Sequence, residues 1–203
     1  VTGEPAFDAL GLLLTEVDIP RWVIDDIIAG FALDADDWRP RSEKDLLRYC
    51  YHVAGAVGVA MALVMGIDPE DQRTMDRAAD LGLAFQLANI ARDVAEDASA
   101  DRCYLPMEWL VEMDIPPGQH MHPAFRPRLA VMGKWLAEMA EEYEASARWG
   151  ARKLPPRSRW AVLAAAGVYG DIAREVRRRG QGAWDHRAST SKLAKLAWIA
   201  KAG

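Results

Sequence analysis

The sequence is poor in cysteine and has no long uninterrupted apolar run. Its 203 residues include two cysteines, Cys50 and Cys103, which cannot form a disulfide framework and do not form a C-x-x-C pair. Both facts favour a reduced, cytoplasmic setting and argue against a structural zinc site. The apolar run over 53–65 is broken by Gly55 and Gly58 and is shorter than the roughly 18 residues of a membrane-spanning helix, so no span is expected.

Basic residues are in the minority, with 25 Lys and Arg against 30 Asp and Glu. A net charge of -5 gives no general attraction to nucleic acid or anionic membranes, so no nucleic-acid partner is expected and local groups must meet any anionic substrate. The first residues lack an initiator Met and the basic and apolar regions of a signal peptide, so we expect a longer parent protein. Hydrophobic residues make up 51% of the chain, enough for one domain over 1–203.

Strand patterns are lacking as well, since no β-branched alternation is bounded by turn signals. Apolar residues recur instead at spacings of three and four almost everywhere, which predicts an all-α domain. Prolines and glycines mark the connections between the helices. The predicted helices cover residues 6–17, 20–32, 43–65, 70–98, 106–112, 124–152, 157–179 and 189–201.

A stripe of polar side chains marks the predicted helix 70–98. At about 100° per residue, Gln86, Asn89, Asp93 and Asp97 fall at roughly 0°, 300°, 340° and 20°, whereas apolar residues cover the rest of the circumference. Such a helix is typically buried, with its polar stripe facing a cavity. Carboxylates one turn apart repel each other, and Mg²⁺ prefers oxygen ligands, so Asn89, Asp93 and Asp97 are candidate metal ligands. A solvated face with surface ion pairs remains the alternative.

Three further features allow a structural and a functional interpretation. Small residues within 49–58 let another element approach the backbone, which suits either tight helix packing or the wall of an apolar pocket. His52 has no partner at a metal or triad spacing, so we expect a structural role. Arg174 and the run 177–179 are typical of a solvated helix end, and their alternative role is to guide an anionic substrate inward.

Three segments, 49–55, 86–97 and 102–106, occur in an order that resembles the squalene and phytoene synthase family. The likeness covers most of the chain, and 182–187 is similar to the bacterial phytoene synthases in particular. It implies a single-domain isoprenoid synthase bundle of helices around a central cavity. Phytoene synthases of this family condense two geranylgeranyl diphosphates head to head, through prephytoene diphosphate, into phytoene for carotenoid biosynthesis. Mg²⁺ is the implied metal, with Mn²⁺ as the other ion that fits.

The resemblance also implies roles for individual residues. Metal coordination falls to the positions that match the family's second aspartate-rich motif, which are Asn89, Asp93 and Asp97. Substrate binding falls to groups near the diphosphate or along the prenyl chain, which are Gln86, Asn89, Tyr104, Tyr169, Arg187, Val53 and Val57. The candidate catalytic residues are Asp93, Asp97, Tyr49 and Arg92.

One departure from the family pattern is the lack of its first aspartate-rich motif, which we expect upstream of this sequence. The domain is therefore expected to be partial and to lack its N-terminal helices. The pair Asp25 and Asp26 lies in a later family segment and is not taken as a substitute, while Asp34 is expected near the cavity. A squalene or dehydrosqualene synthase that uses farnesyl diphosphate, or a non-catalytic isoprenoid-binding fragment, remains the alternative. An apolar product implies peripheral membrane contact, and the oligomeric state stays open.

Overall fold

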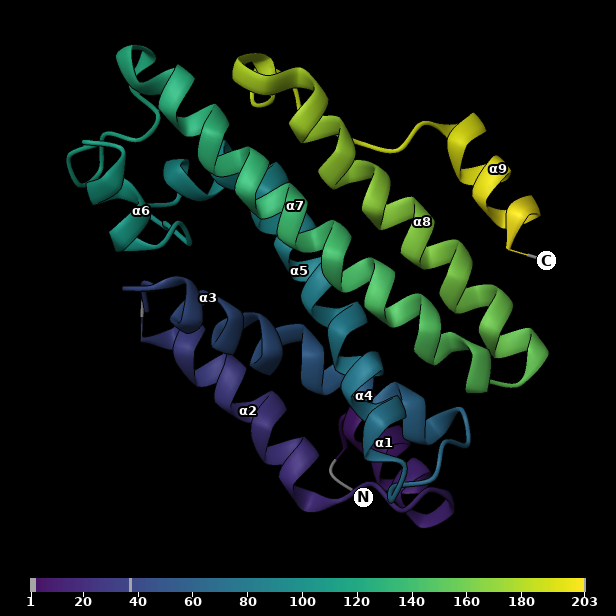
Figure 1. Cartoon of the computed structure of the whole chain (residues 1–203). Helices are drawn as coiled ribbons and strands as arrows, with labels where there is room; N and C mark the ends of the chain where they lie inside the picture. The colour runs from purple at the N-terminus through teal and green to yellow at the C-terminus, as the bar shows by residue number, and fades with distance from the viewer. Residues whose placement is uncertain (1–2, 37, 203) are drawn as a thin grey trace.

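Three long helices form the centre of the molecule, for which a computed structural model describes residues 3–36 and 38–202. These helices are α5 (Gln72–Ser99), α7 (Arg126–Gly150) and α8 (Pro156–Arg179), and they pack against one another along much of their length (Figure 1). No strand occurs within the described ranges. The all-α fold predicted from the sequence is therefore confirmed.

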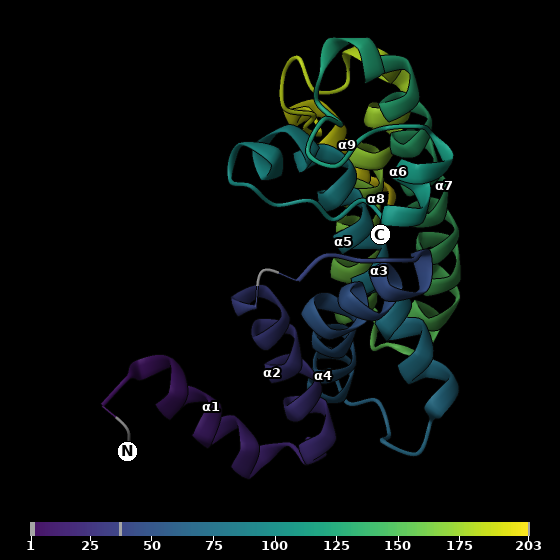
Figure 2. The same cartoon turned by 90° about the vertical axis from the view of Figure 1, so that its left-hand side faces the viewer.

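Shorter helices surround this centre on two sides. α2 (Arg21–Ala35), α3 (Glu43–Cys50) and α4 (Ala56–Val64) lie on one side of α5, and α1 (Pro5–Glu16) extends beyond them at one end (Figure 2). α6 (Met107–Glu112) lies near the opposite end, and α9 (Lys192–Lys201) packs against α8. Three short 3₁₀ turns complete the described chain: Pro123–Phe125, Ala151–Lys153 and Gly180–Gly182.

Local sequence explains where several helices begin and end. The Ser42 and Asp45 side chains cap each other's backbone N–H groups at the start of α3, and the Asp71 and Ser191 side chains accept hydrogen bonds at the starts of α5 and α9. α8 ends at Gly180, whose φ of +54° suits a residue without Cβ. Most predicted boundaries agree with the observed ones within three residues.

The predicted continuous helix 43–65 is wrong in one respect, because Tyr51–Gly55 forms a π-helical segment between α3 and α4. This segment and α4 press closely on α5. A Cβ atom on Gly58 would collide with the backbone oxygen of Ala78, and one on Gly82 would collide with that of Ala54. Glycine at these positions therefore permits a backbone-to-backbone approach that no side chain would allow.

Two apolar clusters account for most of the buried side chains. The larger joins α3, α5, α6, α7 and α8 around residues such as Leu87 and Leu136, and the smaller joins α2, α4 and α5 around Val23 and Leu63. The stretch Glu43–Val64 is long and apolar enough to cross a membrane by length and composition alone. Its packing in both clusters gives the ordinary reason for that apolarity, since the core helix of a folded domain has the same composition.

Candidate active site

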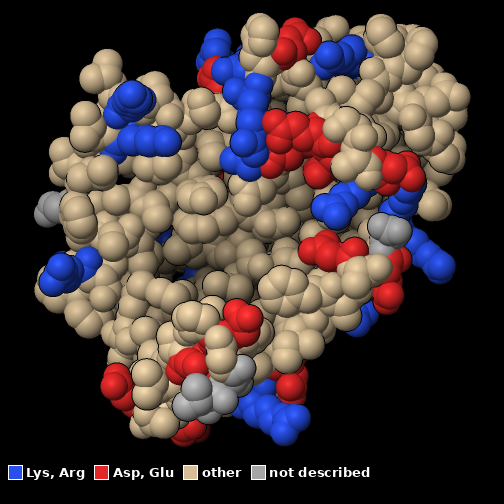
Figure 3. Space-filling model, turned by 180° about the vertical axis from the view of Figure 1, so that it is seen from behind, with Lys and Arg blue, Asp and Glu red and all other residues tan. Residues whose placement is uncertain are grey.

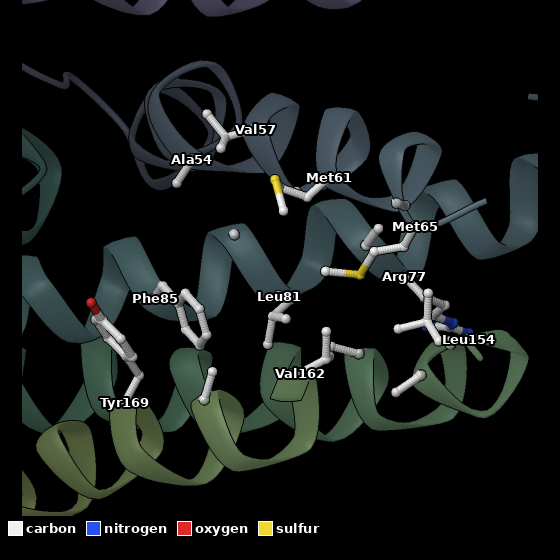
Figure 4. A pocket seen from close by; sticks show the side chains of 18 of the residues that line it. Ala54, Val57, Met61, Met65, Arg77, Leu81, Phe85, Leu154, Val162 and Tyr169 are labelled. Atoms are coloured by element: carbon white, nitrogen blue, oxygen red, sulfur yellow. The ribbon is translucent and has the colours of Figure 1, made fainter. Parts of the chain in front are cut away.

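An elongated cavity of about 440 Å³ lies between the π segment and α4 on one side and α5 and α8 on the other. Figure 3 shows a hollow on the back of the molecule whose walls are largely neither acidic nor basic, and Figure 4 shows the side chains along the cavity. Small and apolar side chains make up most of the wall. They include Val53, Ala54, Val57, Met61, Met65, Leu81, Phe85, Leu154, Val162 and Ala165.

One end of the cavity is polar because α5 presents its predicted stripe there. Gln86 and Asn89 line the cavity, and Asp93 and Asp97 follow on the next two turns, about 6 Å apart along the helix axis. The side-chain oxygen of Asn89 is buried and has no hydrogen-bond partner within the described part of the chain. A buried acceptor of this kind is costly unless a ligand satisfies it, so Asn89 suits a site that a ligand completes.

Two aromatic rings separate the apolar length of the cavity from this polar end. Phe85 on α5 and Tyr169 on α8 stack with their ring centroids 4.2 Å apart, and both line the cavity (Figure 4). Tyr169 carries a hydroxyl, and the polar residues Gln86 and Asn89 line the same cavity. The pair therefore combines an apolar wall with a hydrogen-bonding group at the point where the cavity becomes polar.

Two arginines hold the carboxylate of Asp93. Arg92 donates from Nε and Nη2 to the two carboxylate oxygens, and Arg187 donates from Nε and Nη2 to Oδ1 at 3.1 and 3.0 Å. Burial opposes ionisation of Asp93, but the hydrogen bonds from both arginines outweigh it and lower the pKa of this carboxyl. Asp93 is therefore an anion, and two cations lie where a second anion could bind.

Asp97 lies in the opposite electrostatic situation. Burial, followed by repulsion from Asp93, raises the pKa of Asp97 to about 6, although the nearby cations Arg102 and Arg92 favour its ionised form. A carboxylate that is hard to ionise beside another carboxylate is stabilised by a bound cation. The arrangement thus suits a divalent metal between Asp93 and Asp97.

Tyr49 and Tyr104 occupy a separate cluster beside this polar end. Their hydroxyls donate to the same oxygen of Asp34 at 2.7 and 3.4 Å, and their rings stack 5.0 Å apart, with Trp38 on the other face of Tyr49. Burial is the main cause that raises the pKa of both phenols, so they act as hydrogen-bond donors. Neither tyrosine lines the main cavity, but Tyr104 borders a small cleft together with Asp97.

The structure brings most of the predicted site residues to one region, where some line the cavity and others contact Asp93 or Asp34. Gln86, Asn89, Tyr169, Val53 and Val57 line the cavity. Arg92 and Arg187 contact Asp93. Tyr49 and Tyr104 contact Asp34, the residue that the sequence analysis expected near the cavity. Both interpretations of the segment 49–58 hold at once, because it packs tightly on α5 and also lines the cavity.

The remaining candidates have structural partners. The Nδ1 atom of His52 lies 3.1 Å from the backbone oxygen of Asp26, which agrees with a structural role. Arg174 pairs with Glu144 and Asp171, Arg177 pairs with Glu141, and Arg178 and Arg179 pair with Glu175. These arginines are engaged with acidic side chains of α7 and α8, so nothing in their contacts favours the role of guiding an anion.

Arg77 was not predicted and lies at the other end of the cavity (Figure 4). It contacts Asp80 and Ser146, which keeps a charged group at the end of an otherwise apolar wall. The sequence carries no signal for this position, because an arginine on the early turns of a helix is equally typical of a solvent-exposed face.

Comparisons with known proteins support a common origin with isoprenoid synthases. A model of the squalene/phytoene synthase family matches residues 1–194. A phytoene synthase of Pseudescherichia vulneris is 46% identical over 197 residues, and a 15-cis-phytoene synthase of Enterobacter agglomerans is 47% identical over 199 residues. The alignments cover 97% and 98% of this chain but 63% and 67% of the two relatives. A crystal structure of a dehydrosqualene synthase in complex with ligand matches with a TM-score of 0.88 and 27% identity, covering 100% of this chain and 71% of that one.

Proposed function

Because the chain belongs to the squalene/phytoene synthase family, we propose that it acts in the Mg²⁺-dependent head-to-head condensation of two geranylgeranyl diphosphates, through prephytoene diphosphate, to phytoene. The observation that carries this proposal is an apolar cavity that ends at Asn89, with Asp93 and Asp97 on the next turns. Identity of 46% and 47% to two phytoene synthases supports geranylgeranyl over farnesyl diphosphate as the substrate. In this proposal the product enters carotenoid biosynthesis.

The two parts of the site would perform different tasks. Arg92 and Arg187 would bind the oxygens of a diphosphate, and their charges would stabilise the extra negative charge that develops when it leaves. The apolar wall along Val57, Met61 and Val162 would hold the prenyl chain and keep water from the carbocation. Tyr169 would donate a hydrogen bond where these two parts meet.

The donor set fits part of a magnesium shell. No three His, Cys, Asp or Glu side chains within the described ranges are grouped to hold a metal by themselves. Asp93, Asp97 and the unpartnered oxygen of Asn89 would supply protein ligands, and the rest of the shell would come from diphosphate oxygens and water, as is usual for Mg²⁺. When bound, the metal would neutralise charge on the leaving diphosphate.

The two arginines that contact Asp93 would couple the binding of the metal to that of the diphosphate. Both carboxylate oxygens already accept hydrogen bonds from Arg92, so a metal must compete with that ion pair. A diphosphate would draw Arg92 and Arg187 toward its own oxygens and leave Asp93 available. Metal and diphosphate are therefore expected to bind more tightly together than separately.

Substitution of the two aspartates tests the proposal. Asp93→Ala and Asp97→Ala should each lower the rate of phytoene formation about a hundredfold or more, since they remove charges that hold the metal and the arginines. Glu142→Ala, at an exposed position on α7, should leave the rate unchanged. Full activity of both aspartate variants would overturn the assignment.

Product identification separates the remaining possibilities. Reaction mixtures with geranylgeranyl or farnesyl diphosphate, analysed for hydrocarbon products, distinguish phytoene synthesis from squalene or dehydrosqualene synthesis. The match to a dehydrosqualene synthase structure makes that comparison necessary. Tight binding of a non-reactive diphosphate analogue without turnover of either substrate would instead favour a non-catalytic isoprenoid-binding role.

A further inference from the structure

Two segments of this acidic chain contain no Asp or Glu. The first runs from 145 to 170 and carries Arg148, Arg152, Lys153, Arg157 and Arg159. The second runs from 186 to 203 and carries Arg187, Lys192, Lys195 and Lys201. Because the whole chain has a formal net charge of -5, these segments concentrate positive charge in one part of the sequence.

Large apolar side chains are exposed on the same segments. Leu193 and Leu196 on α9 are 80% and 62% exposed, and Trp149 at the end of α7 is 64% exposed. Trp160 on α8 and Ile199 on α9 are also exposed. Apolar groups this large are costly in water when they gather next to one another, and such gatherings commonly mark a surface for binding.

Contacts of Trp198 and Trp160 fix α9 on α8. The Trp198 indole N–H donates to Asp171 at 2.6 Å, and the guanidinium groups of Arg148 and Arg174 lie 5.4 and 5.7 Å from the centre of its ring. The indole N–H of Trp160 donates to the backbone oxygen of Ile199 at 2.9 Å. The exposed face of α9 is therefore held in place.

The helical period sets which face of α9 meets solvent. Ala194 and Trp198, one turn apart, are partly buried against α8, while Lys192, Leu193 and Leu196 are exposed on the remaining surface. The face combines two leucines with lysine side chains, whose long stems can lie beside an apolar phase while the charges reach its polar border.

This basic side of the molecule adjoins the cavity. The upper left of Figure 3, where α9 and the adjoining part of α8 lie, carries basic side chains and no acidic ones, and the hollow lies beside it. The cavity residues Leu154, Ala161 and Val162 belong to the same acid-free segment 145–170. Nearby acids are already engaged, since Glu144 and Asp171 hold Arg148 and Arg174, and Asp71 lies 4.0 Å from Lys153.

We propose that this basic apolar surface, made by α9 and the exposed residues of 149–160, docks on an anionic phospholipid bilayer. Lysines and arginines are attracted to the negative headgroups, and leucine and tryptophan side chains enter the boundary between headgroups and acyl chains. α1 and α2 also expose apolar residues, such as Phe7 and Phe31, but the sequence over 4–36 has eight acidic residues and one basic residue, Arg21. An anionic bilayer would therefore attract the surface around α9 and repel the surface of α1 and α2.

Docking there would bring the cavity close to the bilayer. An apolar product could then pass from the side of the cavity formed by Leu154 and Val162 into the acyl phase without crossing water. This consequence rests on the function proposed above, whereas the binding to lipid rests on the surface alone and can be measured without substrate.

Vesicle sedimentation tests the docking surface. The protein is mixed, without substrate, with vesicles of phosphatidylcholine alone or with 30% phosphatidylglycerol, and the bound fraction is measured against lipid concentration. Lys192→Gln/Lys195→Gln should weaken partition to the anionic vesicles about 25-fold, from the attraction of two lysines, and Leu193→Ser/Leu196→Ser should weaken it about tenfold. Circular dichroism and thermal unfolding verify that each variant is folded.

Matched variants on other surfaces serve as controls. Lys44→Gln removes an exposed lysine from α3, and Leu12→Ser removes a leucine of α1 that is as exposed as those on α9. Both should bind anionic vesicles like the unchanged protein. Equal binding by the α9 double variants and these controls, or equal binding to neutral and anionic vesicles, would overturn the proposal.

Two other outcomes would also refute it. Binding of a single-stranded oligonucleotide without any binding to vesicles would identify the surface as one for nucleic acid. A dimer in light scattering that Leu193→Ser/Leu196→Ser converts to a monomer, with no vesicle binding, would identify it as a contact between two copies. Vesicle binding with no phytoene synthesis would support the docking surface and reject the proposed function.

Discussion

Replacement of Asp97 by asparagine should stabilise the protein at neutral pH. Asp97 is half-buried on α5 near Asp93, and this position raises its pKa from 3.8 to about 6. A pKa displaced by roughly two corresponds to about 3 kcal/mol, and solvent screening at a partly exposed carboxyl reduces this to about 1 kcal/mol. An amide of nearly the same shape carries no charge, so Asp97→Asn should remove that cost.

The pH dependence gives the sign of the effect. A carboxyl whose pKa is higher in the folded state stabilises the fold while it is protonated, below about pH 4, and this stability is lost as the pH rises through about 6. The advantage of Asp97→Asn over the unchanged protein should therefore be small near pH 4 and complete near pH 7.5. At neutral pH it should raise Tm by about 2 to 4 °C in a domain of this size.

Thermal unfolding followed by circular dichroism at both pH values measures this difference. Glu142→Gln, at an exposed position on α7, is the matched control and should show no such change with pH. Mg²⁺ together with a diphosphate should raise the Tm of the unchanged protein more than that of Asp97→Asn. A lower Tm for Asp97→Asn at pH 7.5, or an advantage that does not vary with pH, would refute the reasoning.

Two further changes test the packing between the helices. Glu144→Gln removes the negative charge that Arg148 and Arg174 share, while Arg174 keeps Asp171 as a partner. Because both arginines are partly exposed, the change should lower the free energy of unfolding in urea by about 2 kcal/mol, less than for a fully buried pair. An unchanged midpoint of unfolding would contradict this. Gly58→Ala drives a methyl group into the Ala78 carbonyl and should cost about 1 to 3 kcal/mol, whereas Gly11→Ala on α1, with open space around it, should be neutral or slightly stabilising.

Helical period and turn residues were enough to predict most of the fold. The spacing of apolar residues identified each long helix, because burial of one face requires that spacing wherever the helix packs. The π segment at Tyr51–Gly55 could not be predicted in this way. Its five residues follow a pattern compatible with an α-helix, so the spacing of apolar residues does not distinguish the two windings.

The helical period predicted the positions of some residues of the candidate site, and long-range contacts determine those of the others. Gln86 and Asn89 lie one turn apart on one helix, so their common position on the cavity follows from the period alone. Arg187 reaches Asp93 from 94 residues away, and the family resemblance suggested its role while no local pattern could place it. The shared contact of Tyr49 and Tyr104 with Asp34 depends likewise on how α2, α3 and the loop before α6 meet.

The π segment also determines how the chain around the cavity could change during evolution. A π turn holds about one residue more than a turn of α-helix, so deletion of one residue from 51–55 would convert the segment to α-helix and leave the direction in which α4 faces nearly unchanged. Val57 and Met61 would stay on the cavity wall, whereas deletion of one residue within α4 would turn every later residue of that helix by about 100°. The chain could thus lose one residue at this point while the wall of the pocket and the residues around Asp93 kept their positions.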